Sequence, residues 1–302
     1  MKRDKCIVLT RRDFIRGTVG TALGTSFLGC GRTEANEVKK KKRAATITPN
    51  KIVVVRDKQV MAADRKIDKT VLKRMVDQCV LKLTGKTSPK EAWSAIVDPG
   101  DVVGLVTTDH LNPTHKELVE AVTDALRRFG IPEKNIVMAQ GSLDGPKSCT
   151  ALISMPALKA HWLTGIGTVL KNYIMFSGNP SAYHDEKSVK LGEIWNLPEV
   201  KGKTRLILVD ALYPLCDKGP QADPRYQWTY KGLVAGVNPV ALERVCINII
   251  EAKRRALKGA PWPLSPPPIC VEAAEKKFGL GTGDLKKIRL ETIGWKEEIL
   301  LT

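Results

Sequence analysis

The sequence predicts an α/β domain built on a mostly parallel sheet with helices on both faces. Short apolar runs alternate along the chain with longer segments in which apolar residues recur every three or four positions. This is the pattern of buried strands alternating with amphipathic helices. The first of these elements follow one another as strand, helix, strand with short connections, and that order favours parallel strands with a helix packed across them.

Five segments are expected to form strands. The segment Val102–Val106 is apolar throughout, as is typical of a parallel strand that is buried on both faces. The expected strands are Ile52–Val55, Val102–Val106, Ile136–Ala139, Arg205–Val209 and Lys287–Ile293.

Helical spacing of apolar residues predicts helices over residues 67–83, 118–129, 239–257 and 271–278. The segment from Thr114 to Glu117 fits a capping box before the second of them. Asn238 and Pro239 are expected to start the third, because asparagine caps a helix and proline is tolerated in its first turn.

The first thirty residues are read as an export signal. Thr10 to Arg16 follows the twin-arginine pattern, with Arg11 and Arg12 before an apolar pair, and a weakly apolar run of 17–29 follows. We therefore expect the twin-arginine translocase as a partner and a periplasmic or extracytoplasmic location for a chain exported already folded. The expected organisation is a signal peptide over 1–30, a basic flexible linker over 31–48 and a single α/β domain over 49–302.

The end of the apolar run resembles a lipoprotein cleavage box, in which Cys30 would be the acylated residue. A lipid on Cys30 would tether the protein to the membrane through the polar linker. The alternative is ordinary cleavage near Ala35, which would discard Cys30 and release the product.

The net charge of +17 is not taken as a sign of nucleic-acid binding. The first 45 residues carry 12 Lys or Arg and four Asp or Glu, so nearly half of the excess lies in the leader and linker. The remainder lacks a nucleic-acid motif or a basic stripe interleaved with aromatic residues. We expect no nucleic acid as a partner, and a small anionic ligand instead.

The loop after the second expected strand is the first candidate binding segment. Ligands of parallel α/β sheets collect at the carboxyl ends of the strands, and this loop also enters the N-terminus of a helix, which favours an anion. Its polar residues can equally serve only to cap and turn the chain. The candidate substrate-binding residues here are Asp109, His110, Asn112, Thr114 and His115.

The second candidate cluster consists of Lys159, His161, Lys171 and Asn172. In an extended segment Lys159 and His161 project from the same face. A lysine can hold a carboxylate or act as a base when it is desolvated, and a histidine can move a proton or bind a metal. On composition alone, solvated lysines and a structural histidine would be the preferred interpretation.

Seven motifs stand out from Val102 onward: Pro113-Thr114-His115-x-Glu117-Leu118-Val119, Pro156-x-Leu158-Lys159-x-His161-x-Leu163-Thr164-Gly165, Leu170-Lys171-Asn172, Val209-Asp210-Ala211-Leu212, Gly219-Pro220, Asn238-Pro239-Val240-Ala241-Leu242 and Gly279-Leu280-Gly281-Thr282. Together they resemble the domain of unknown function 362 family. Asn238, Glu243 and Gly167 depart from the residues usual in that family. The ferredoxin-like cysteine clusters of some relatives are absent from this sequence, so no iron–sulfur cluster is expected.

The loop Asp109-x-x-Asn112-Pro113-Thr114 is also similar to a turn of the nickel-pincer lactate racemase family, in which an arginine stands at the position of Asn112. That resemblance implies proton or hydride movement on a small hydroxy acid, with a metal or a metal-bearing cofactor.

Together these resemblances imply an exported enzyme acting on a small anionic, hydroxy acid-like substrate. Lys159, His161 and Lys171 are the expected catalytic residues, and His161 and His184 are the expected metal ligands. Asn172 and Asp210 join the binding loop as expected substrate contacts. The alternative is a non-catalytic metal- or ligand-binding accessory protein of the cell envelope.

Overall fold

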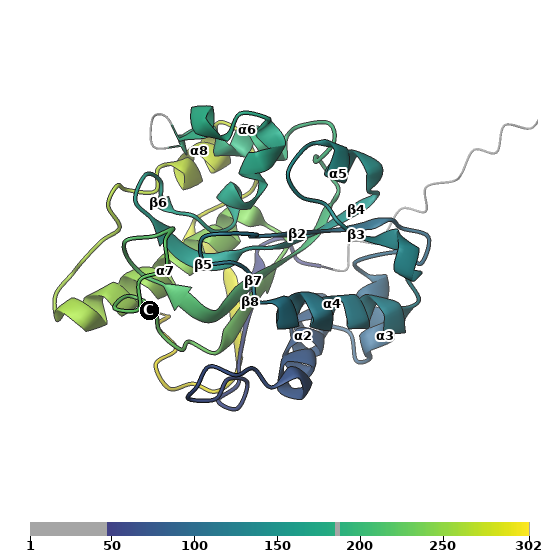
Figure 1. Ribbon diagram of the computed structural model, residues 1–302, viewed down its shortest axis with the longest axis horizontal. Helices are drawn as coiled ribbons and strands as arrows, with labels where there is room; N and C mark the ends of the chain where they lie inside the picture. Colours follow the sequence, from purple (N-terminus) through teal and green to yellow (C-terminus); the bar gives the residue numbers. More distant parts are fainter. Residues whose placement is uncertain (1–46, 185–187, 302) are drawn as a thin grey trace, which may run out of the picture. The chain divides into compact units, whose positions relative to one another are not determined.

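The computed structural model describes residues 47–184 and 188–301 (Figure 1). The predicted signal with Arg11 and Arg12, the lipidation site Cys30 and nearly all of the linker lie outside the described residues. Within the described part, no helix combines the length and the apolar character that a membrane span requires.

Nine strands of the described chain form one mixed, mostly parallel sheet in the order β3-β2-β4-β7-β8-β1-β9, with β5 attached to β7 and β6 attached to β5. The pairs β2–β3, β2–β4, β4–β7, β5–β7 and β1–β9 are parallel, while β8 is antiparallel to both its neighbours and β6 is antiparallel to β5. The strands are β1 Lys51–Arg56, β2 Val103–Thr107, β3 Ile136–Met138, β4 Ala151–Met155, β5 Ala157–His161, β6 Gly165–Ile166, β7 Thr204–Leu215, β8 Gly232–Gly236 and β9 Arg289–Gly294.

Helices cover both faces of the sheet, as predicted. Helices α2, α3 and α4 lie on one face, and α6, α7 and α8 on the other (Figure 1). The helices are α2 Lys69–Thr84, α3 Pro89–Ser94, α4 Lys116–Phe129, α5 Asp144–Ser148, α6 Leu191–Trp195, α7 Pro239–Lys258 and α8 Cys270–Lys276, with 3₁₀ turns η1 Glu133–Asn135, η2 Leu170–Ser177, η3 Pro180–Tyr183 and η5 Leu285–Lys287.

A separate hydrophobic core fills the space on each side of the sheet. Along β1 the side chains alternate between the two cores: Ile52 and Val54 pack with α7 and α8, whereas Val53 and Val55 pack with α2 and α4. Successive side chains of a strand point to opposite faces, so a strand that is apolar throughout supplies both cores. This explains why the continuous apolar runs are the central strands.

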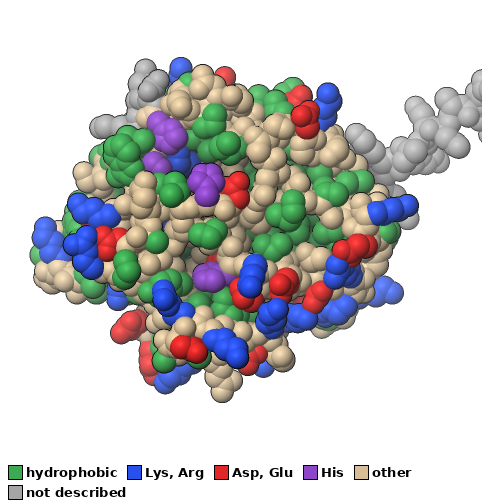
Figure 2. Space-filling model, in the orientation of Figure 1, with side chains coloured by type: hydrophobic (Ala, Val, Ile, Leu, Met, Phe, Trp, Pro, Cys, Tyr) green, Lys and Arg blue, Asp and Glu red, His purple; other side chains and the backbone are tan. Residues whose placement is uncertain are grey.

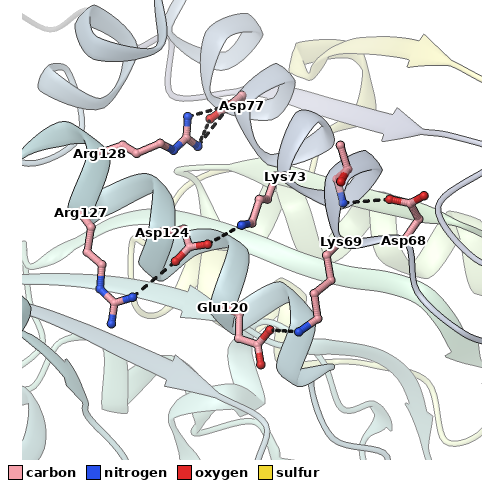
Figure 3. Close-up of polar contacts among 9 residues, drawn as sticks. Asp68, Lys69, Lys73, Asp77, Glu120, Asp124, Arg127 and Arg128 are labelled. Carbon is pink, nitrogen blue, oxygen red and sulfur yellow. Dashed lines mark hydrogen bonds and ion pairs between the residues drawn. The ribbon is translucent and has the colours of Figure 1, made fainter.

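Helices α2 and α4 also carry a row of ion pairs across their exposed surface (Figure 3). Lys69 pairs with Glu120 at 2.6 Å, Lys73 with Asp124 at 2.5 Å, and Arg128 with Asp77 at 3.3 Å. Solvent screens such exposed pairs, and holding long side chains in one geometry costs entropy. The apolar stripes of the two helices, and not these pairs, therefore supply most of the stability of their contact.

The five predicted strands and four predicted helices are all present, within a few residues of the expected limits except that β7 runs on to Leu215. Asn238 caps α7 as expected, since its side-chain oxygen accepts from the N–H groups of Val240 and Ala241. The predicted capping box of α4 is wrong: His115 is the N-cap and makes no capping bond with its side chain. The hydroxyl of Thr114 donates instead to the Met155 carbonyl at 2.6 Å.

Candidate functional site

A cavity of about 290 Å³ opens beside the carboxyl end of β2, the position expected for a ligand site in a parallel sheet. The loop after β2, the strand β5, the 3₁₀ turn η2 and the end of η3 form its walls. Histidine side chains gather on one face of the protein, next to hydrophobic groups (Figure 2). Polar lining residues are Thr107, Thr108, Asp109, His110, Gln140, Lys159, His161, Lys171, Asn172 and His184.

The fold thus brings together the two candidate clusters, which are about fifty residues apart in the sequence. Seven predicted site residues line the cavity: Asp109, His110, Lys159, His161, Lys171, Asn172 and His184. Four others, Asn112, Thr114, His115 and Asp210, are not among the residues that line it. Their contacts show that they support the loop from behind.

Asp210 fixes the end of this loop. Its Oδ2 atom accepts hydrogen bonds from the His115 backbone N–H at 2.8 Å and from His115 Nδ1 at 2.7 Å. Burial alone would lower the pKa of His115, but the adjacent Asp210 carboxylate outweighs burial and the pKa is raised. The hydrogen bonds between Asp210 and His115 therefore hold the end of the loop against β7.

Lys159 is held by the same loop from the cavity side. Its ammonium group donates to the carbonyls of Leu111 at 2.7 Å and Asn112 at 3.3 Å. Leu111 and Asn112 both have positive φ, 53° and 69°, a conformation that leucine in particular rarely adopts. The Asn112 side chain accepts from Gln227 Nε2 at 2.8 Å, so its amide secures the turn, and the turn presents two carbonyls to the lysine.

Burial changes the acid–base chemistry of both lysines. Desolvation lowers the pKa of Lys159 to about 8, although Asp109 partly opposes it. Desolvation and the neighbouring charge of Lys159 lower the pKa of Lys171 to about 7. A lysine whose pKa lies near neutrality exists partly as the free amine, which can accept a proton.

His184 lies against Lys171. Its Nδ1 atom is 2.9 Å from the Pro180 carbonyl, and its Nε2 atom is within hydrogen-bond distance of Lys171 Nζ. A carbonyl oxygen can only accept, so Nδ1 carries a proton and, in the neutral ring, Nε2 presents its lone pair to the amine. This arrangement allows a proton to pass between Lys171 and His184.

His161 has the opposite tautomer. Its Nδ1 atom accepts from the Leu163 backbone N–H at 3.2 Å, so in the neutral ring the proton is on Nε2. Desolvation, together with the charges of Lys171, His184 and Lys159, lowers the pKa of His161 to about 3. His161 is thus neutral across the physiological range and can serve as a hydrogen-bond donor.

The Asn172 side chain ties η2 to the sheet. Its Nδ2 atom donates to the Val106 carbonyl at 2.8 Å and to Ser154 Oγ at 3.0 Å, and its Oδ1 atom accepts from Thr108 Oγ1 at 3.3 Å. Because both ends of the amide are already bonded, Asn172 positions the neighbouring Lys171. The predicted direct contact of Asn172 with a substrate stays a prediction.

Sequence reasoning missed Glu243 as part of this site. Its side chain is fully buried on α7, and its two oxygens accept from the backbone N–H groups of Val169 at 2.8 Å and Leu170 at 3.3 Å. These residues start η2, one position before Lys171. Burial raises the pKa of Glu243 to about 7, although the two N–H donors oppose the shift. The sequence did contain a signal for this role, because Glu243 stands among the apolar residues on the buried side of a helix.

The part of the chain that the structure describes contains no group of three or more His, Cys, Asp or Glu side chains that could hold a metal ion. Of the two expected ligands, His184 has its Nδ1–H bonded to a carbonyl, as metal-bound histidines usually do, but its Nε2 atom contacts Lys171 Nζ. His161 offers its Nδ1 lone pair to a backbone N–H instead.

Residues 144–248 match the model of a protein family described as "Domain of unknown function (DUF362)". The matched segment runs from α5 into α7 and contains Lys159, His161, Lys171, His184 and Glu243. This match supports the resemblance seen in the sequence motifs. No curated protein and no solved structure matches the chain significantly.

The Glu243→Gln variant tests the buried carboxyl group. Because the pKa of Glu243 is raised from its usual 4.5 to about 7, the folded state binds the proton more tightly than the unfolded state. The resulting stabilisation is present below about pH 4.5 and is lost as pH rises through about 7. Urea unfolding should show the native chain losing stability relative to Glu243→Gln between pH 5 and pH 8.

The matched control is Glu272→Gln, at an exposed site on α8 that pairs with Lys276. Its difference from the native chain should stay constant over the same pH range. A constant difference for Glu243→Gln as well would show that this carboxyl group is ionised throughout.

Proposed function

We propose that this protein is an enzyme that binds a small anionic, hydroxy acid-like substrate in the cavity and moves a proton on it. The observation that carries the proposal is the pair of lysines in one cavity. Among the residues that the structure describes, neither Lys159 nor Lys171 forms an ion pair with a carboxylate. A carboxylate or phosphate of the substrate would supply such a partner.

The two lysines would have different roles. Lys159 is anchored to two carbonyls, so it would hold the anionic group in place as a charge-assisted donor. Lys171, with a pKa of about 7 and His184 beside it, would take or give the proton at the reacting carbon. His161, neutral with its proton on Nε2, would donate a hydrogen bond to a substrate oxygen.

The resemblance to the lactate racemase family also implies a bound metal. His184 would hold it through Nε2 only in place of the contact with Lys171 Nζ, and a metal there would supply Lewis-acid polarisation of a substrate oxygen. With one such histidine, the remaining ligands would come from the substrate or from a bound cofactor. The proton transfer proposed for Lys171 depends only on residues of this chain.

Removal of either lysine should weaken anion binding. Lys159→Met and Lys171→Met keep most of the side-chain length and delete the charge. The affinity for lactate or phosphate should therefore fall roughly 10- to 150-fold. This range corresponds to the loss of one hydrogen bond to a charged group, which contributes about 1.5–3 kcal/mol. Isothermal titration calorimetry measures this loss. Lys134→Met, at an exposed site on η1, is the matched control and should leave affinity unchanged.

The pH dependence of the same titration has a defined sign. The anion binds the protonated lysines, so affinity should be highest below pH 7 and fall as pH rises through about 7 and 8, the pKa values of Lys171 and Lys159. Affinity that is equal at pH 6 and pH 9, or unaffected by both lysine substitutions, would contradict the anion site. Binding without any turnover would favour the accessory-protein alternative.

We also propose that the protein works outside the cytoplasm, because its first residues follow the twin-arginine pattern. Changing both Arg11 and Arg12 to lysine should leave the full-length chain in the cytoplasm, whereas Arg3→Lys should not affect export. Cell fractionation with immunodetection measures this. Delivery of the double variant to the periplasm at the native level would show that another route carries the protein.

A further inference from the structure

The cavity has buried polar groups inside and a mixed margin outside. Lys159 and His161, which line its inner wall, are each only 5% exposed. At the margin, the polar side chains of Asp109 and His110 are exposed on one loop. Beside them stand three exposed apolar residues, since Leu111 is 44% exposed, Trp162 is 59% exposed and Met175 is 36% exposed.

The exposed apolar residues are concentrated at this site. The described chain has eight large apolar side chains classed as exposed, and three of them line this one cavity. Single exposed apolar residues are ordinary, whereas a group of them around a cavity marks a binding surface. Hydrophobic side chains beside the histidines are visible on this face in Figure 2.

Two apolar residues of this margin stand next to the polar groups inside, one through a hydrogen bond and one along the chain. The Leu111 carbonyl accepts from Lys159 Nζ at 2.7 Å. Trp162 follows His161 directly, and its backbone N–H donates to the Gly219 carbonyl at 2.8 Å.

The third apolar residue, Met175, lies on η2, the same 3₁₀ turn that carries Lys171. The fold therefore sets the apolar margin and the buried charges at a fixed separation, as a ligand with two unlike ends requires.

We propose that the ligand of this cavity is an amphiphilic carboxylate. Its carboxylate group contacts Lys159, the lysine proposed to hold the anion, and its alkyl or aromatic group packs against Leu111, Trp162 and Met175. The inference rests on the proposed anion site and adds the class of substrate: a free small acid with an apolar substituent. The volume of about 290 Å³ is at the lower end of the range for small-molecule sites, which suits a short acid.

A series of acids with one charge and increasing chain length tests the inference. Acetate, butyrate and hexanoate are titrated into the purified protein, and the dissociation constants are measured by calorimetry. Affinity should increase by up to about three- to fourfold for each added methylene that is buried. Hexanol should bind much more weakly than hexanoate, because it lacks the charge that the lysines recognise.

Two variants assign the apolar contact. Trp162→Ala should flatten the dependence on chain length while acetate affinity stays within about twofold of the native value. Leu285→Ala removes an apolar side chain that is 47% exposed and does not line the cavity, and it should leave the whole series unchanged.

The outcomes separate this inference from the proposed function. Equal affinities from acetate to hexanoate, still dependent on Lys159, would overturn the amphiphilic ligand and leave the anion site standing. Absence of binding across the series, or binding that ignores both lysines, would overturn both. Trp162-dependent binding of the protein to phosphatidylglycerol vesicles, without binding of hexanoate, would overturn the inference in favour of a membrane surface.

Discussion

The burial of two lysine amines in one cavity is the constraint on which the site depends. A buried ammonium loses its hydration, which lowers the pKa of both lysines toward neutrality, and the charge of Lys159 lowers the pKa of Lys171 further. The fold offsets part of this cost for Lys159 with the carbonyls of Leu111 and Asn112. It gives Lys171 a histidine instead of a carboxylate as its described partner.

The supporting contacts come from distant parts of the chain. Glu243 on α7 holds the start of η2, Asn172 ties η2 to β2 and β4, and Asp210 on β7 holds the loop through His115. In each contact, a polar side chain forms a hydrogen bond with the backbone or a side chain of another segment. These residues fix the positions of the lysines without lining the cavity, apart from Asn172.

Five strands and the four longer helices could be predicted because their signals are local, whereas β4, β5, β6, β8 and the short helices α3, α5 and α6 were not predicted. A continuous apolar run such as Val102–Val106 has few alternatives to a central strand, and Asn238 with Pro239 marks a helix start within two residues. The prediction that Lys159 and His161 share one face is also confirmed, since β5 is extended and both residues line the cavity. Local pattern was sufficient in these cases.

The rest depended on partners that only the tertiary structure supplies. Thr114 was expected to cap α4, but the Met155 carbonyl from β4 takes its hydroxyl. His115 was expected to bind substrate, but Asp210, ninety-five residues later, engages it. The role of Glu243 could not be predicted for the same reason, because the two N–H groups that it binds belong to a distant segment of the chain. A sequence pattern shows which residues are polar, and the fold determines which partner each finds.

The most direct test of this account is a pH titration of the lysine side chains. NMR of protein labelled with ¹³C at the lysine ε-carbons monitors the titration of each lysine. Lys159 and Lys171, assigned by their absence from Lys159→Met and Lys171→Met, should titrate near pH 8 and pH 7, with the exposed lysines well above. If both instead titrate with the exposed lysines above pH 10, the cavity is hydrated and the proton-transfer role of Lys171 is wrong.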